Sequence, residues 1–227
     1  MKILAIDTAT EACSAALYLD GRVIERFEIA PQRHAELILP MMDALMAETG
    51  LVLADLDALA FGRGPGGFTG VRIATGVVQG VAFGADLPVV RVSNLAALAQ
   101  RAVREHGATR VLPALDARMD EVYWGAWIRG PEGLVEPVLE EEVARPEDVA
   151  LPDGAGWWGA GAGWAAHGDR LRARLGDRVE HVIEDLYCSA HDVALLGARG
   201  LACGEAVPAE QALPVYLRDR VAAKKGG

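Results

Sequence analysis

The segment at residues 64–70 reads GPGGFTG and lies between an expected strand and an expected helix. Backbone N–H groups of such a loop can bind an anion at the N-terminus of the helix. No lysine follows the glycines, so the segment is not a Walker loop. A tight turn whose glycines only satisfy backbone geometry is an equally good interpretation. The candidate loop residues are Gly64, Pro65, Gly66, Gly67, Phe68, Thr69 and Gly70.

Two carboxylates, Asp7 and Asp116, each follow a short apolar run and occupy matching places in two similar halves of the chain. A nucleotide site would use such carboxylates to hold a metal and phosphates. The residues after Asp7, however, are Thr8-Ala9-Thr10, where a phosphate-binding hairpin needs glycine. We therefore expect a weakened or lost nucleotide site, with Asp7 acting as a turn residue or cap.

Patterns typical of metal or hydrolase chemistry are not found in this sequence. The histidines form no HxxxH or HExxH pair, and the three cysteines form no CxxC pair. No serine, histidine and acid trio stands out. We expect no metal site, and the cysteines should be buried thiols.

The first half of the chain predicts alternating strands and helices. Residues 2–6 form a buried strand, and Asp20-Gly21 is the turn of a hairpin. A helix follows at 34–49, capped by Gly50 and kinked at Pro40. A strand at 58–61, a helix at 71–85, a strand at 89–92 and a helix at 94–105 complete this half.

The second half repeats this order. Residues 111–115 form a strand that ends on Asp116, and further strands are expected at 121–128, 134–139, around Trp157-Trp158 and at 179–183. Helices are expected at 164–175 and 190–202. Two tandem βββαβα units indicate an α/β protein with the duplicated ribonuclease-H-like fold of actin, sugar kinases and Hsp70 ATPase domains. We place the lobes at 1–106 and 107–227, with the tail from about residue 205 packing back on the first lobe.

The expected helix at 71–85 carries Gly76, Gly80 and Gly84 at four-residue spacing, which leaves one helix face without side chains. Each glycine costs up to about 1 kcal/mol relative to alanine. The bare face can pack inside the protein or can form a subunit interface, and the spacing does not decide between them.

The composition favours a globular cytoplasmic protein. Hydrophobic residues make up 52% of the 227 residues, enough for a core without disulfides. Asp7 interrupts the opening apolar run, so we expect neither a signal peptide nor a membrane anchor. The formal net charge is -10, which makes the chain alone a poor ligand for tRNA.

Several segments together resemble the TsaB (YeaZ) family along nearly the whole chain. They are KILAIDTAT at 2–10, HAELILP at 34–40, GPGGFTGVR at 64–72, LDARMDEVYWGAW at 115–127 and PVYLR at 214–218. The chain departs from the family's GPGSFTGLR at Gly67 and Val71, and from its HSE at Ala35. Residues 92–99, VSNLAALA, stand where the paralogue TsaD carries a metal-binding HxxxH helix.

The resemblance implies a non-catalytic subunit of the complex that makes N6-threonylcarbamoyladenosine in tRNA. TsaD would be the main partner, with TsaE and a second copy of this chain as further partners. ATP and the catalytic metal are expected on the partner subunits, and tRNA is expected to be bound only through the complex. The expected partner interface consists of Arg33, His34, Glu36, Leu37, Pro40, Met41, Arg72, Thr75, Gly76 and Gly80.

An independent ATP-binding phosphotransferase of the same fold is the competing interpretation. It predicts tight nucleotide binding and turnover without partners. A metallopeptidase is disfavoured because paired histidines are missing.

Overall fold

The computed structural model describes residues 1–218, which divide into two compact units. The first unit comprises Met1–Ala97 and Cys188–Val215. The second comprises Leu98–Tyr187 and resumes at Tyr216. Each unit contains one five-stranded sheet.

The sheet of the first unit has the strand order β3-β2-β1-β4-β5. Its strands are β1 (Lys2–Asp7), β2 (Ala12–Leu19), β3 (Arg22–Ile29), β4 (Ala58–Gly62) and β5 (Val89–Val92). β1 pairs antiparallel with β2 and parallel with β4. Because β1 is covered on both faces, its residues after Lys2 are all buried, and its sequence is a continuous apolar run ending in Asp7.

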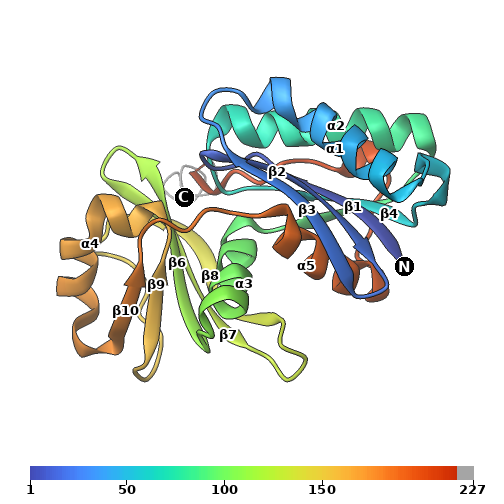
Figure 1. Cartoon of the computed structure of the whole chain (residues 1–227). Coiled ribbons are helices and arrows are strands. Elements are labelled where there is room, and N and C mark those ends of the chain that lie inside the picture. The colour runs from blue at the N-terminus through green and yellow to red at the C-terminus, as the bar shows by residue number, and fades with distance from the viewer. Residues whose placement is uncertain (219–227) are drawn as a thin grey trace. The chain divides into compact units, whose positions relative to one another are not determined.

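Helices cover both faces of this sheet (Figure 1). α1 (His34–Thr49) and α2 (Phe68–Ala85) pack on one face, in a core with Leu4, Ile6 and Phe61. α5 (Ala190–Ala202) packs against β1, β2 and β4 on the other face. A short 3-10 turn, Leu53–Asp55, precedes β4.

The helix ends show where the sequence predictions succeed and fail. Gly50 is left-handed at φ 67° and caps α1, as its position predicts. α1 continues through the exposed Pro40, and the kink expected there stays a prediction. α2 begins at Phe68 and not at Val71, so half of the predicted glycine loop is the first turn of the helix.

The sheet of the second unit has the order β10-β9-β6-β7-β8. Its strands are β6 (Arg110–Arg118), β7 (Glu121–Arg129), β8 (Val135–Ala144), β9 (Trp157–Ala160) and β10 (Val179–Ile183). If β6 to β10 are matched with β1 to β5 in chain order, the two sheets have the same topology. This confirms the duplicated fold.

The second repeat differs from the first in two respects. Residues 145–156 form loops and turns where the first repeat has α1, so the predicted βββαβα order lacks its first helix here. β6 also continues through Asp116 to Arg118, two residues beyond its predicted end.

Three tryptophans organise the core of the second unit. Trp124, Trp157 and Trp164 are fully buried, and their indole N–H groups donate to the carbonyl oxygens of Ala150, Asp153 and Leu112. Trp164 belongs to α4 (Ala162–Leu175), which packs on β6, β9 and β10. The 3-10 turn Gly176–Arg178 then leads into β10.

The division into units corrects the predicted lobe boundary. The cut falls inside α3 (Asn94–His106), and α5 belongs to the first unit although it follows the second sheet in sequence. The physical reason is that α5 packs on the first sheet, where the Cβ of Ala60 leaves room only for glycine at Gly197. The residues from the end of α5 to Val215, including the 3-10 turn Ala209–Gln211, belong to this unit, and Val207 pairs with Val89. The predicted packing of the tail on the first lobe therefore holds to Val215, and Tyr216 begins a return to the second unit.

Within residues 1–218, the structure contains no helix long and apolar enough to cross a membrane.

Candidate functional site

Asp7 is a buried carboxyl at the C-terminal end of β1. It accepts hydrogen bonds from the Ala9 backbone N–H at 3.1 Å and from the Asn94 side-chain amide. The Asn94 side-chain oxygen in turn accepts from the Gly64 N–H at 2.7 Å. Burial raises the pKa of Asp7 to about 7, although its two hydrogen bonds oppose the shift. The group therefore links β1, α3 and the glycine loop inside the first unit.

The predicted glycine loop packs against the backbone that follows β1. The Gly67 N–H donates to the Ala9 carbonyl at 2.8 Å, and the Thr8 hydroxyl donates to the Gly70 carbonyl at 2.6 Å. A Cβ on Gly66 would lie 2.7 Å from the Ala9 carbonyl oxygen, and one on Gly70 would overlap the Thr8 carbonyl. The glycines at these two positions are thus required by contact between two backbone segments.

The remaining loop residues have different surroundings. Gly64 has φ 99°, and a Cβ there would lie 2.9 Å from the Val215 carbonyl oxygen. The segment after α5 therefore packs against this end of the loop. Pro65 is buried, whereas Gly67, Phe68 and Thr69 are exposed. Phe68 is covered on one side by Arg72, whose guanidinium carbon lies 3.6 Å from the ring centroid.

Asp116 lies in the second unit, on β6. It accepts from the Arg118 backbone N–H at 2.8 Å and pairs with the Arg118 guanidinium at 3.0 Å. His167 lies 3.8 Å away on α4, at a residue with non-helical φ and ψ. Asp116 therefore stabilises the start of the β6–β7 turn, within its own unit.

The predicted interface residues fall into two groups. His34 and Thr75 are buried: the His34 ring bonds to the Thr10 carbonyl, and the Thr75 hydroxyl donates to the Val71 carbonyl. Leu37 and Met41 are half-buried and pack on the core of the first unit. The exposed members of the predicted set are Arg33, Glu36, Pro40, Arg72, Gly76 and Gly80.

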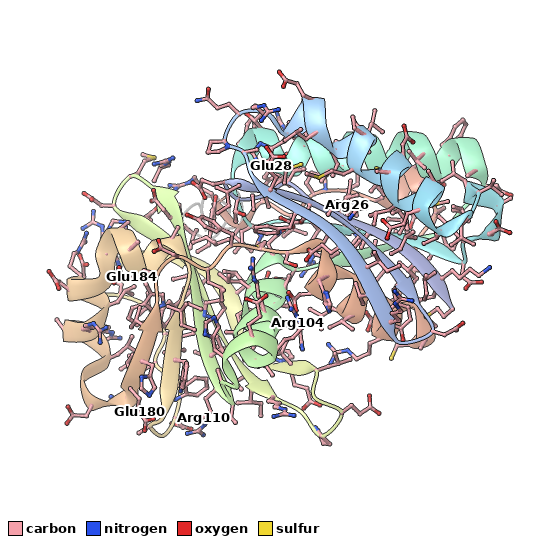
Figure 2. The ribbon with its side chains drawn as sticks, viewed as in Figure 1. Arg26, Glu28, Arg104, Arg110, Glu180 and Glu184 are labelled. Atoms are coloured by element: carbon pink, nitrogen blue, oxygen red, sulfur yellow. The ribbon has the colours of Figure 1, made fainter. Side chains whose placement is uncertain are left out.

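Arg33 is positioned by two exposed ion pairs. Its guanidinium lies 3.1 Å from Glu28 on β3 and 3.4 Å from Glu36 on α1. Glu28 is labelled on β3 in Figure 2. Exposed pairs of this kind contribute little to stability. They do fix the orientation of a charged side chain at the start of α1.

The glycine stripe of α2 faces outward. A Cβ on Gly76, Gly80 or Gly84 would meet no atom within 4 Å. Phe83, on the same helix, is 81% exposed, and Leu39 on α1 is 47% exposed. Packing against the part of the chain that the structure describes therefore does not account for the stripe.

Three residues of these regions were missed by the sequence predictions. Asn94 is the first residue of α3, and the helix is capped by the residue before it, Ser93, whose hydroxyl accepts the Ala96 N–H at 3.2 Å. The Asn94 side chain instead bonds to Asp7 and Gly64, which no local pattern indicates. Phe83 and Leu39 look like core residues of their helices in the sequence, and only their exposure in the structure distinguishes them from the buried apolar residues.

The comparisons with known proteins agree with this structure. Residues 27–157 match the family model described as TsaD, tRNA N6-adenosine threonylcarbamoyltransferase. A protein of Escherichia coli K12, called tRNA threonylcarbamoyladenosine biosynthesis protein TsaB, is 47% identical over 99% of this chain and 98% of its own length. The chain belongs to the TsaB family. The Haemophilus influenzae protein of the same name is 40% identical over 99% of this chain and 97% of its own length.

Solved structures support the same assignment to the TsaB family. A solved structure described as YeaZ from Pseudomonas aeruginosa has a TM-score of 0.88 and 51% identity, and the match covers 95% of this chain and 99% of that one. A second Pseudomonas aeruginosa structure, described as similar to peptidase YEAZ, has a TM-score of 0.89 and 50% identity with the same coverage. The fold is thus the actin and Hsp70-like fold of this family.

Proposed function

We propose that this chain is a non-catalytic subunit of the complex that transfers a threonylcarbamoyl group to the adenosine next to the anticodon of tRNAs that read A-starting codons. In this proposal it binds and activates TsaD, the enzyme that makes N6-threonylcarbamoyladenosine. The name of the Escherichia coli relative and the match to the TsaD family model support this role.

The observation that carries the proposal is the outward-facing glycine stripe of α2. Glycine inside an exposed helix is unfavourable by up to about 1 kcal/mol per residue. Cβ atoms at Gly76, Gly80 and Gly84 would have no neighbour within 4 Å among residues 1–218. A bare stripe beside an exposed aromatic ring, here Phe83, suits close approach of a helix from another subunit.

The environment of Asp7 supports a non-catalytic role. Its carboxyl is fully buried and already accepts hydrogen bonds from Ala9 and Asn94. The space beside the neighbouring glycines is filled by the backbone of Thr8 and Ala9. Phosphates placed there would have to displace protein backbone. We therefore assign ATP and the catalytic metal to the partner subunits.

TsaD is the proposed main partner, and TsaE and a second copy of this chain are further proposed partners. The chain carries a formal net charge of -10, and tRNA is a polyanion that proteins grip mainly with Lys and Arg. We therefore propose that tRNA is engaged only through the assembled complex, in the cytoplasm.

The proposal is tested by reconstituting threonylcarbamoyl transfer to unmodified tRNA from TsaD, TsaE and the enzyme that supplies the activated substrate. The reaction is run with the wild-type chain, without it, and with Gly80→Leu. Gly168→Leu is the matched control, because Gly168 also lies in a helix and its Cβ position is also free of neighbours within 4 Å.

We expect transfer to require the chain, to fall at least tenfold with Gly80→Leu and to be unchanged with Gly168→Leu. The mass of the mixture with TsaD, measured by light scattering, should drop for Gly80→Leu in parallel. Transfer that proceeds equally without the chain would refute the proposal. ATP turnover by the purified chain alone would instead support a phosphotransferase.

A further inference from the structure

The structure brings together two segments that lie about a hundred residues apart in sequence: the β6–β7 turn and the PVYLR segment. Arg218 donates from Nη2 to the Ala117 carbonyl at 2.8 Å. Its Nη1 lies 2.6 Å from the Glu121 carboxylate and 3.7 Å from the Met119 sulfur. One guanidinium therefore contacts residues before, within and after the turn, all in the second unit.

The turn has an unfavourable backbone. Arg118, Met119 and Asp120 are consecutive, none is glycine, and their φ angles are 61°, 56° and 60°. Left-handed backbone costs an L-residue roughly 1–2 kcal/mol. The pairing of β6 with β7 also shifts register between Asp116 and Arg118. Such a turn persists only where surrounding contacts hold it.

The turn's own side chains contribute little packing. The side chains of Arg118 and Asp120 are 85% and 82% exposed, and Met119 is 80% exposed. Asp116 holds the backbone N–H of Arg118 on one side. Arg170 on α4 approaches Asp120 to 3.8 Å and is bound more closely by Glu147, at 2.6 Å. Arg218 supplies the contacts that span the turn.

We infer that residues 216–218 form a strap on the second unit, in which Arg218 is a clasp that fixes the left-handed β6–β7 turn. Leu217 is 3% exposed, and the Arg218 guanidinium makes the contacts to the turn. A clasp made by one partly exposed side chain can open without unfolding the unit. The turn is therefore held when Arg218 is bound to it and released when the Arg218 contacts open.

The charge pair at the clasp makes this equilibrium dependent on salt. The side chains of Arg218 and Glu121 are 40% and 28% exposed, so dissolved ions screen their attraction. Higher ionic strength should favour the released state.

Hydrogen exchange of backbone amides tests the inference. The peptide covering residues 114–124 is followed in the full-length wild-type protein and in Arg218→Ala, Arg218→Lys and Glu121→Gln. Arg178→Ala is the matched control, because Arg178 lies in the same unit and donates to a backbone carbonyl, that of Leu175, at 3.3 Å. The peptide covering residues 2–19 reports on the first unit.

We expect Arg218→Ala to speed exchange in 114–124 about tenfold, the loss of one charge-assisted contact. Arg218→Lys should recover part of this protection, and Arg178→Ala should leave it unchanged. Added salt should speed exchange at 114–124 in the wild type and have little effect in Glu121→Gln. The inference would be wrong if Arg218→Ala left exchange in 114–124 unchanged, or if exchange in 2–19 accelerated equally.

Discussion

The Thr8 carbonyl oxygen lies where a Cβ on Gly70 would have to be, and the Thr8 hydroxyl donates to the Gly70 carbonyl at 2.6 Å. The first turn of α2 and the residues after β1 are therefore in direct backbone contact. Gly70→Ala must separate them, and we expect it to destabilise the protein by about 1–3 kcal/mol. Urea unfolding followed by circular dichroism measures this change.

Gly76→Ala is the matched control for that substitution, because it lies in the same helix with open space around its Cβ position. Alanine there should stabilise the protein by up to about 1 kcal/mol. Equal effects of the two substitutions would show that the Thr8 contact does not constrain Gly70.

The pH dependence of stability should reveal the buried Asp7. Its pKa in the folded protein is about 7, above its ordinary value of 3.8. Between these values the folded protein holds a proton that the unfolded chain has lost. The stability contributed by this group is therefore fully present below the unfolded pKa and is lost as pH rises through about 7.

Asp7→Asn should remove this decline. From pH 5 to 7 the wild type should lose up to about 1.4 kcal/mol per pH unit relative to the variant. Urea unfolding of both proteins at intervals of half a pH unit measures the difference in their free energies of unfolding. The contributions of other titrating groups are the same in both proteins and cancel in this difference. A constant difference across this range would mean that Asp7 titrates with an ordinary pKa.

Asn94 should be important for stability, because it bridges Asp7 and the Gly64 N–H. Asn94→Ala leaves the Gly64 N–H and one oxygen of Asp7 without a partner, while the other Asp7 oxygen keeps the Ala9 N–H. We expect a loss of about 3 kcal/mol. Asn94→Asp should be worse at pH 8 than at pH 5, since two carboxylates would then be adjacent. Calorimetric melting temperatures at the two pH values check both expectations.

Thiol reactivity should distinguish the cysteines. Cys13 is buried, and burial raises its pKa to about 12, while Cys188 is buried and Cys203 is exposed. Iodoacetamide should therefore modify Cys203 alone in the native protein at pH 8. Mass spectrometry should find one adduct in the wild type, none in Cys203→Ser and three after denaturation.

The fold was largely predictable from sequence because its signals are local. The apolar run before Asp7, the Asp20-Gly21 turn and the Gly50 cap each specify their element without distant contacts. The start of α2 was misplaced because Gly70 reads as a loop residue. Glycine is needed at position 70 because of its contact with Thr8, which is 62 residues away in sequence.

The candidate site was less predictable, since its decisive features are tertiary. Sequence left open whether the glycine stripe faces inward, and only the empty space around Gly80 answers this. Two proposed interface residues, His34 and Thr75, proved to be buried. Each of these polar side chains is hydrogen-bonded to a nearby backbone carbonyl. The interface itself stays a prediction.

The place of α5 in the first unit has a consequence for how the chain is made. One face of the first sheet is covered by a helix that begins at Ala190, after the whole second sheet. A ribosome synthesises chains from the N-terminus at about 5–20 residues per second. The first sheet therefore keeps that face uncovered for roughly 5–20 seconds, the time needed to synthesise the chain from the end of β5 to the end of α5. A nascent chain halted near residue 106 should depend on chaperones to stay soluble.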